Sequence, residues 1–119
     1  MCVFCEITDF VIENELAGAF YDKFPVSTGH LLIIPKSHRM DYFDLSIAEK
    51  QAIEELLQIG KKLLEETNEP AGFNIGTNCG INAGQSIMHC HIHLIPRYLG
   101  DMVNPKGGVR GVIPSKQHY

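Results

Sequence analysis

Short apolar runs separated by polar turns predict four β-strands and one long helix along this chain. Residues 17–21 (AGAFY) and 30–34 (HLLII) are rich in β-forming residues, and the loop between them favours an antiparallel pair. Residues 73–77 (FNIGT) and 88–95 (MHCHIHLI) show the same pattern on either side of a turn rich in glycine and asparagine. The order strand, strand, helix, strand, strand indicates an α+β domain with an antiparallel sheet.

The helix is predicted over residues 46–67. Ser46 can cap its first turn, and Glu49 completes a capping box three residues later. Apolar side chains recur at helical spacing on one side of this segment, at Ile53, Leu56, Leu57, Leu63 and Leu64. We therefore expect a helix that covers the core of the sheet. The tail from Gly100, which is rich in glycine and proline, is expected to form a loop or a flap.

The composition is that of an ordinary globular protein. The chain has 119 residues, 45% of them hydrophobic and 20% charged, so we expect one domain, residues 1–119. The net charge of −4 provides no basic field for duplex nucleic acid. The sequence contains neither a membrane-spanning apolar run nor a signal-peptide pattern, so we expect a cytoplasmic protein. In that compartment the four cysteines, Cys2, Cys5, Cys79 and Cys90, are expected to be reduced.

Five of the six histidines lie in two short segments, HLLIIPKSH and HCHIH. Because side chains alternate along a strand, His89, His91 and His93 are expected on one face. The opposite face, which packs on the helix, then carries Cys90, Ile92 and Leu94. The histidine face could simply be solvated, but its alternation with apolar residues in the middle of the chain favours a chemical role.

Two chemical roles are possible for these histidines. The outer pair would lie about 13 Å apart on a strand, so one metal ion held by all three is a poor fit to Zn–N bonds of about 2.0–2.1 Å. A nucleophilic role fits better, because neutral imidazole is available near its ordinary pKa of about 6.5 and can form a covalent intermediate. The turn before the strand offers backbone N–H groups after Gly84 and the hydroxyl of Ser86 to an anionic oxygen, and Gln85 and Asn78 add amide donors.

These segments resemble the histidine triad (HIT) superfamily of nucleotide hydrolases and transferases. The signature His-φ-His-φ-His-φ-φ, with φ apolar, is matched by HCHIHLI at residues 89–95, after Gly84-Gln85-Ser86. GHLLIIPK at residues 29–36 and FYD at residues 20–22 match further family segments. The resemblance implies a HIT-like α+β fold with a five-stranded antiparallel sheet, one long helix and a short helix, whose fifth strand would lie around residues 10–15. Members usually form homodimers, so we expect a homodimer.

The resemblance also implies roles for individual residues. His91 would attack the α-phosphorus and form a nucleotidyl-histidine intermediate, while His93 and His30 would contact phosphate oxygens. The residues implied to hold phosphate or bridging oxygens are Asn78, Gln85 and Ser86. Asp22 would accept hydrogen bonds from the ribose hydroxyls, a role that suits an ionised carboxylate. The base pocket would be lined by Phe4, Ile7 and Phe20, each of which could equally be a core residue.

A structural zinc site is implied by the same resemblance. Cys2-Val3-Phe4-Cys5 alone could be a redox pair or two buried thiols. A subset of HIT proteins binds zinc with such a pair, a histidine after the Pro-Lys segment and the first triad histidine. The matching residues are Cys2, Cys5, His38 and His89, a closed tetrahedral set. No organic cofactor is expected.

The resemblance leaves several activities open. Asymmetric hydrolysis of diadenosine polyphosphates is favoured by the tail at residues 104–114 (NPKGGVRGVIP), which resembles tails of such hydrolases and offers Lys106 and Arg110 to a polyphosphate. A nucleoside phosphoramidase is the alternative, although that branch often ends in a Trp-Pro-Pro-Gly tail and this chain has no tryptophan. A nucleotide-binding interaction protein with little turnover and a nucleotidyltransferase are further possibilities. The expected ligand in each case is a purine nucleotide or a dinucleoside polyphosphate.

Overall fold

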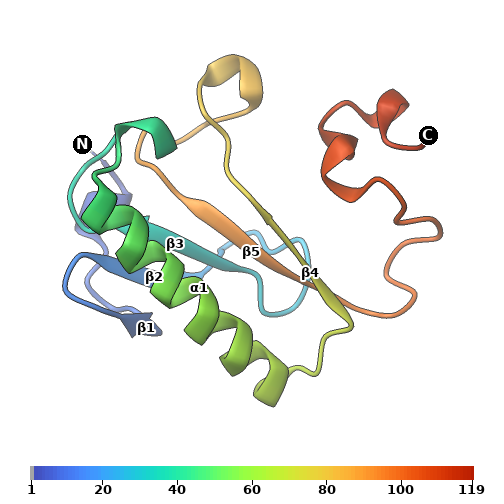
Figure 1. Cartoon of the computed structure of the whole chain (residues 1–119), viewed down its shortest axis with the longest axis horizontal. Coiled ribbons are helices and arrows are strands. Elements are labelled where there is room, and N and C mark those ends of the chain that lie inside the picture. The colour runs from blue at the N-terminus through green and yellow to red at the C-terminus, as the bar shows by residue number, and fades with distance from the viewer. Residues whose placement is uncertain (1) are drawn as a thin grey trace.

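The computed structural model describes residues 2–119 and contains one five-stranded antiparallel sheet (Figure 1). Its strands are β1 (Ile12–Glu13), β2 (Ala17–Tyr21), β3 (Leu31–Pro35), β4 (Gly72–Gly76) and β5 (Ile92–Arg97). They lie in the order β1-β2-β3-β5-β4, so β1 and β4 are the edges. The implied five-stranded sheet is confirmed, and its first strand falls within residues 10–15. The implied short helix takes the form of 3-10 segments of three to five residues.

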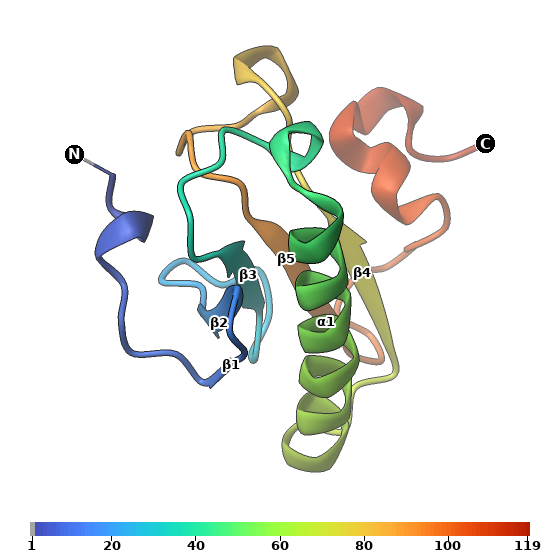
Figure 2. The same cartoon turned by 60° about the vertical axis from the view of Figure 1, so that its left-hand side comes forward.

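The long helix α1 (Ile47–Thr67) covers one face of the sheet (Figure 2). The predicted capping box is present: Glu49 N–H donates to Ser46 Oγ at 3.1 Å, and Ser46 N–H donates to the Glu49 carboxylate at 2.8 Å. Ile53 and Leu56 of the helix are buried together with Ile33 and other residues of the sheet. The apolar stripe of the helix therefore covers the core, as its spacing predicted.

Strand β3 is buried on both faces. Leu31 packs with Leu64 of α1, whereas Leu32 and Ile34 pack with Phe4 on the opposite face. Phe4 belongs to a 3-10 turn, Phe4–Glu6, and Figure 2 shows this N-terminal segment on the side of the sheet away from α1. The N-terminal segment thus forms a partial second layer, over the face that carries the histidines.

The last strand begins later than predicted, at Ile92 instead of residue 88. Sheet pairing starts where Ile92 lies opposite Ile33. Before that point, Cys90 N–H donates to the carbonyl of Arg39 at 2.7 Å, and the Thr77 hydroxyl donates to the carbonyl of His91 at 2.8 Å. These two hydrogen bonds, one to a loop carbonyl and one from a side-chain hydroxyl, take the place of hydrogen bonds between strands. The alternation of side chains nevertheless persists, with Cys90 and Ile92 in the core under α1.

The tail runs back beside β4, away from β1 (Figure 1). Arg97 holds its start by donating to Asp101 at 2.7 and 2.9 Å and to Asn74 Oδ1 at 2.7 Å. The predicted loop contains two 3-10 segments, Gly108–Val112 and Pro114–Lys116. Across residues 2–119, no helix is long and apolar enough to cross a membrane.

Candidate active site and metal centre

The middle histidine has one ring nitrogen fixed by a hydrogen bond and lines a cavity. His91 Nδ1 lies 2.9 Å from the carbonyl oxygen of His89. A carbonyl oxygen can only accept, so Nδ1 carries the proton, and in the neutral ring Nε2 holds the lone pair. His91 lines a cavity of about 570 Å³, which we call the first cavity. This arrangement presents a nucleophilic nitrogen to any group bound there.

The other two histidines of this site form a chain with one consistent set of tautomers. Val26 N–H donates to His30 Nδ1 at 3.0 Å, which leaves the proton of the neutral His30 ring on Nε2. His30 Nε2 lies 2.9 Å from His93 Nδ1, so His30 donates and His93 accepts. The proton of His93 is therefore on Nε2. His93 lines the first cavity, where this N–H can donate to a bound oxygen.

The surroundings of His30 and His93 favour their neutral forms. Burial lowers the pKa of His93 to about 4, with smaller contributions in the same direction from the neighbouring His91 and His30 and an opposing effect of Asp22. Burial also lowers the pKa of His30, and Asp22 Oδ2, 3.6 Å from His30 Nε2, opposes that shift. Both rings are thus neutral at physiological pH, in agreement with the hydrogen bonds.

Apolar residues of the N-terminal segment and of β2 line the same cavity. Phe4 is buried, with its ring edge-on to Phe20 at a centroid distance of 5.3 Å and to His91 at 5.2 Å. Phe4, Ile7 and Phe20 all line the first cavity, and they also pack with Leu32 of β3. These residues therefore belong both to the wall of the cavity and to the hydrophobic core, the two roles that the sequence left open.

The glycine-rich turn forms the rim beside His91. Asn78, Gly84 and Ser86 line the first cavity, and Gly84 adopts a left-handed conformation (φ 97°) that favours glycine. Gln85 is placed differently. Its Nε2 donates to the carbonyls of Met40 and Ile87, and its Oε1 accepts from Gly80 N–H. Gln85 is buried with its amide engaged by the backbone, so it shapes the turn, in contrast to the expected direct contact with phosphate.

Asp22 lies at the end of β2, where it lines the first cavity. Its Oδ1 accepts from Phe24 N–H at 3.0 Å, a bond that fixes the loop after the strand. Its Oδ2 remains within 3.6 Å of the buried His30 ring. The carboxylate is therefore held in place with acceptor capacity left over for a ligand.

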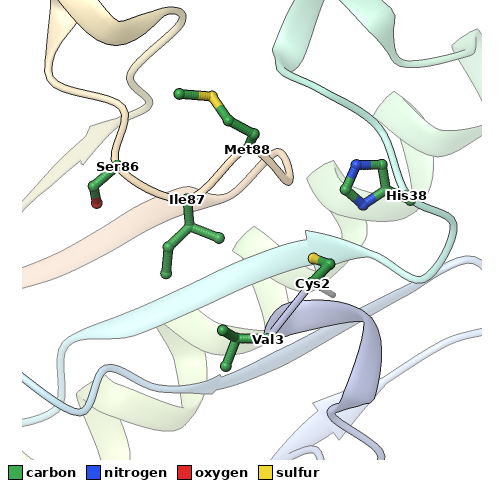
Figure 3. Close-up of a pocket in the computed structure, with 6 residues that line it drawn as sticks. All are labelled: Cys2, Val3, His38, Ser86, Ile87 and Met88. Atoms are coloured by element: carbon green, nitrogen blue, oxygen red, sulfur yellow. The ribbon is translucent and has the colours of Figure 1, made fainter.

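The four predicted zinc ligands converge. The ligand atoms of Cys2, Cys5, His38 and His89 all lie within 4.8 Å of one another. Cys5 Sγ is 3.2 Å from His38 Nδ1, and Cys2 Sγ is 3.4 Å from His89 Nδ1. Figure 3 shows Cys2 and His38 near each other on one side of a cavity that Ser86, Ile87 and Met88 also line. Two thiols and two imidazoles are the donor set of a structural zinc site.

The tautomer of His89 fits metal binding. His89 is fully buried, and its Nε2 lies 2.8 Å from the carbonyl oxygen of Pro35, to which it donates. The lone pair is therefore on Nδ1, the nitrogen that faces the thiols. A carbonyl that accepts from the second ring nitrogen is the usual outer partner of a metal-bound histidine. The four residues together could hold a metal ion.

Some positioning residues have no signal in the sequence pattern. Thr77 holds the carbonyl of His91, and Val26 fixes the tautomer of His30 through its backbone N–H. A backbone donor has no side-chain signature, so Val26 could not be found from the sequence. Thr77 ends the third predicted strand, and only the fold shows that its hydroxyl reaches the carbonyl of His91. Lys106 and Arg110 lie 4.7 and 4.8 Å from the ring of Tyr119, not in the lining of the first cavity.

The chain is similar to known proteins in both sequence and fold. The HIT domain family matches residues 6–100. An uncharacterised HIT-like protein of Mycoplasma genitalium is 42% identical over 103 residues, which cover 82% of this chain and 73% of the relative. AP-4-A phosphorylase of Mycobacterium tuberculosis is 32% identical over 92 residues, which cover 76% of this chain and 47% of the relative.

A solved structure agrees with the fold described above. The zinc-bound histidine triad family protein of Mycobacterium smegmatis matches with a TM-score of 0.78 and 31% identity, over 87% of this chain and 79% of that one. The family match covers most of the chain, including the residues that bring His30, His91 and His93 together. This chain belongs to the HIT domain family.

Proposed function

We propose that this protein hydrolyses nucleotides at the α-phosphate through a covalent intermediate on His91, with diadenosine polyphosphates as the main substrates. The observation that carries the proposal is the fixed tautomer of His91, which lines a cavity of about 570 Å³ and whose Nδ1 donates to the His89 carbonyl. A neutral imidazole held in this way is an activated nucleophile that needs no separate base.

Two displacement steps follow from the geometry. In the first, His91 Nε2 attacks the α-phosphorus, an N–P bond forms and the bond to the bridging oxygen breaks, with its electron pair leaving on that oxygen. His93 Nε2–H donates a hydrogen bond to the leaving group, and the His89 carbonyl stabilises the positive charge that develops on His91. In the second, water attacks the phosphorus, the N–P bond breaks and the lone pair returns to Nε2, while the proton of the water is lost to solvent.

The other predicted residues have roles in binding the substrate. Asp22 accepts from the ribose hydroxyls, and the base lies against Phe4, Ile7 and Phe20. Asn78 and Ser86 donate to the phosphate oxygens at the rim, and Gln85 keeps the rim in shape. The binding roles are supported by the shared lining of one cavity, and that of Gln85 by its hydrogen bonds to the backbone of the turn.

A structural zinc ion and a homodimer belong to the same proposal. Cys2, Cys5, His38 and His89 would hold Zn²⁺, which in such a closed set supplies folding energy. The relative from Mycobacterium smegmatis is zinc-bound, which supports this choice of metal. The exposed edge strand β4, with Ile75 half exposed, offers a surface for a second copy.

Transfer of the nucleotide to phosphate is a second candidate function. It is favoured by the similarity to AP-4-A phosphorylase, since a phosphorylase uses phosphate as the acceptor. Both activities share the first step, and they differ in whether water or phosphate attacks the intermediate. The chain covers less than half of that relative, so hydrolysis remains the first choice.

The test is the set of products from diadenosine tetraphosphate, separated by ion exchange, with and without phosphate. Hydrolysis gives AMP and ATP in either buffer, whereas phosphorolysis gives ADP and ATP only with phosphate. His91→Ala should abolish the products, and His118→Ala, which removes a histidine outside the first cavity, should not. ADP alone, or activity that survives in His91→Ala, would contradict attack by His91 at the α-phosphorus.

A further inference from the structure

A second cavity, of about 560 Å³, adjoins the first at the residues around the reacting phosphate. Both cavities are lined by Asp22, Phe24, Asn78 and His93. His91 lines the first cavity and His30 the second. We call the second one the tail cavity, because the C-terminal tail contributes one wall, at Gly108, Val109, Gly111 and Val112.

The walls of the tail cavity are mainly apolar and are exposed. Its apolar lining residues include Phe24, Val26, Ile95, Val109 and Val112. Phe24 is 82% exposed and Val112 is 78% exposed, so a flat apolar ligand could still cover them. Within residues 2–119, no lysine or arginine lines the cavity. These walls suit an uncharged planar group better than a chain of phosphates.

The basic residues of the tail are directed elsewhere. Lys106 Nζ and the Arg110 guanidinium both lie over the ring of Tyr119, at 4.7 and 4.8 Å from its centroid. Cation–π contacts of this kind hold the end of the chain against the tail. The tail therefore offers the cavity its valines and its glycine backbone instead of positive charge.

The wall that the tail forms is held in a defined place. Arg97 binds both Asp101 and Asn74, and Gly108 passes so close to Asn74 that a Cβ there would lie 3.2 Å from Asn74 Nδ2. Gly107 has φ +89°, and a Cβ on it would lie 1.9 Å from the backbone oxygen of Gln117. The tail therefore packs closely on itself and on β4, as expected for the wall of a binding site.

We infer that the tail cavity binds the leaving nucleoside of a dinucleoside polyphosphate, with its base against Ile95, Val109 and Val112. This inference rests on the proposed function. In an in-line displacement the leaving group departs on the side of phosphorus away from the nucleophile, and the tail cavity begins at His93, which donates to that group. The first cavity then selects the nucleotide that is transferred, and the tail selects what is released.

The test compares two substrates that differ only in the second nucleoside: diadenosine tetraphosphate and adenosine 5′-tetraphosphate. The wild-type kcat/KM should be about tenfold higher for the dinucleoside, the range expected for packing one base on a protein surface. Val109→Ser and Val112→Ser should each reduce this ratio to about threefold or less. Val103→Ser is the matched control, because Val103 is a fully exposed tail valine that lines neither cavity.

The outcomes separate this inference from the proposed function. If the wild type cleaves both substrates with equal kcat/KM, the proposed function stands and the leaving-nucleoside site is refuted. If neither is cleaved, the proposed function fails and the inference fails with it. If the ratio is high but both variants leave it unchanged, the second nucleoside binds elsewhere. If the variants instead turn a dimer into a monomer by sedimentation equilibrium without changing the ratio, a second copy covers the cavity, which also overturns the inference.

Discussion

Replacing His93 with glutamine should make the stability of the protein less dependent on pH. Burial lowers the pKa of His93 to about 4, whereas an unfolded histidine titrates near 6.5. Between these values the unfolded chain binds a proton at His93 that the folded chain does not, so the free energy of unfolding rises with pH. The stability contributed by the neutral ring is complete above pH 6.5 and is lost as the pH falls toward 4.

The size of the effect follows from the pKa difference. A difference of about 2.5 pH units corresponds to about 3 kcal/mol, at 1.36 kcal/mol per unit. That is a large part of the roughly 5–15 kcal/mol that stabilises a typical domain. Burial also lowers the pKa of His30 and of His89, so these two histidines also contribute to the pH dependence of the wild type's free energy of unfolding. The contribution of His93 is isolated by the difference in this pH dependence between the wild type and the glutamine variant.

The assay is urea unfolding of wild type and His93→Gln from pH 7.5 to 4.5, under the same zinc supply. Glutamine keeps an acceptor for the His30 Nε2–H bond, and the packing that it loses is measured at pH 7.5 and subtracted. The wild type should lose about 2–3 kcal/mol more than the variant over this range, since most of the titration window lies inside it.

Equal losses in the two proteins would refute the reasoning. A difference below about 1 kcal/mol would mean that the folded site binds a proton at His93 almost as readily as the unfolded chain. The neutral His93 required by the chain of hydrogen bonds from Val26 would then be absent at mildly acidic pH, and its role as a neutral donor to the leaving group would fail as well.

Three other changes have defined expected results. Cys5→Ser should reduce bound zinc to well under one ion per chain by metal analysis and lower the melting temperature; full zinc content in the variant would contradict the ligand set. Ser46→Ala should cost about 1 kcal/mol in urea unfolding, because Glu49 N–H loses its cap. Gly107→Ala should expose the tail to limited proteolysis, since its Cβ would meet the Gln117 carbonyl; an equally resistant tail would count against this packing.

The elements whose side chains follow a simple period could be predicted from the sequence. Helix α1 begins and ends within one residue of its prediction, because the Ser46 capping box and the apolar stripe are local features. The alternation of the histidines with Cys90 and Ile92 was likewise enough to place the two sets on opposite faces. Residues 17–21 form β2 with the predicted bounds, because the run ends at a polar turn.

The parts that could not be predicted depend on contacts between distant segments. β5 starts at Ile92 because Arg39 and Thr77 hold the preceding residues, and no local pattern records those partners. The Gln85 side chain is engaged by the backbone because its Nε2 donates to the carbonyl of Met40, which is 45 residues away in the sequence. Lys106 and Arg110 lie over Tyr119 because the tail folds back on itself, and charge patterning alone does not show that fold.

One short segment connects the metal centre to the nucleophile. Phe4 lies between the two cysteines, and its ring contacts His89 and His91 at centroid distances of 6.0 and 5.2 Å. His89 in turn faces the thiols with Nδ1 and holds His91 through its carbonyl. An ion that fixes the thiols and His89 therefore also fixes one wall of the first cavity and the tautomer of the nucleophile. Two ligands that order the same residues change each other's affinity by the same factor. A nucleotide in the first cavity should therefore raise the affinity for zinc by the factor by which zinc raises the affinity for the nucleotide.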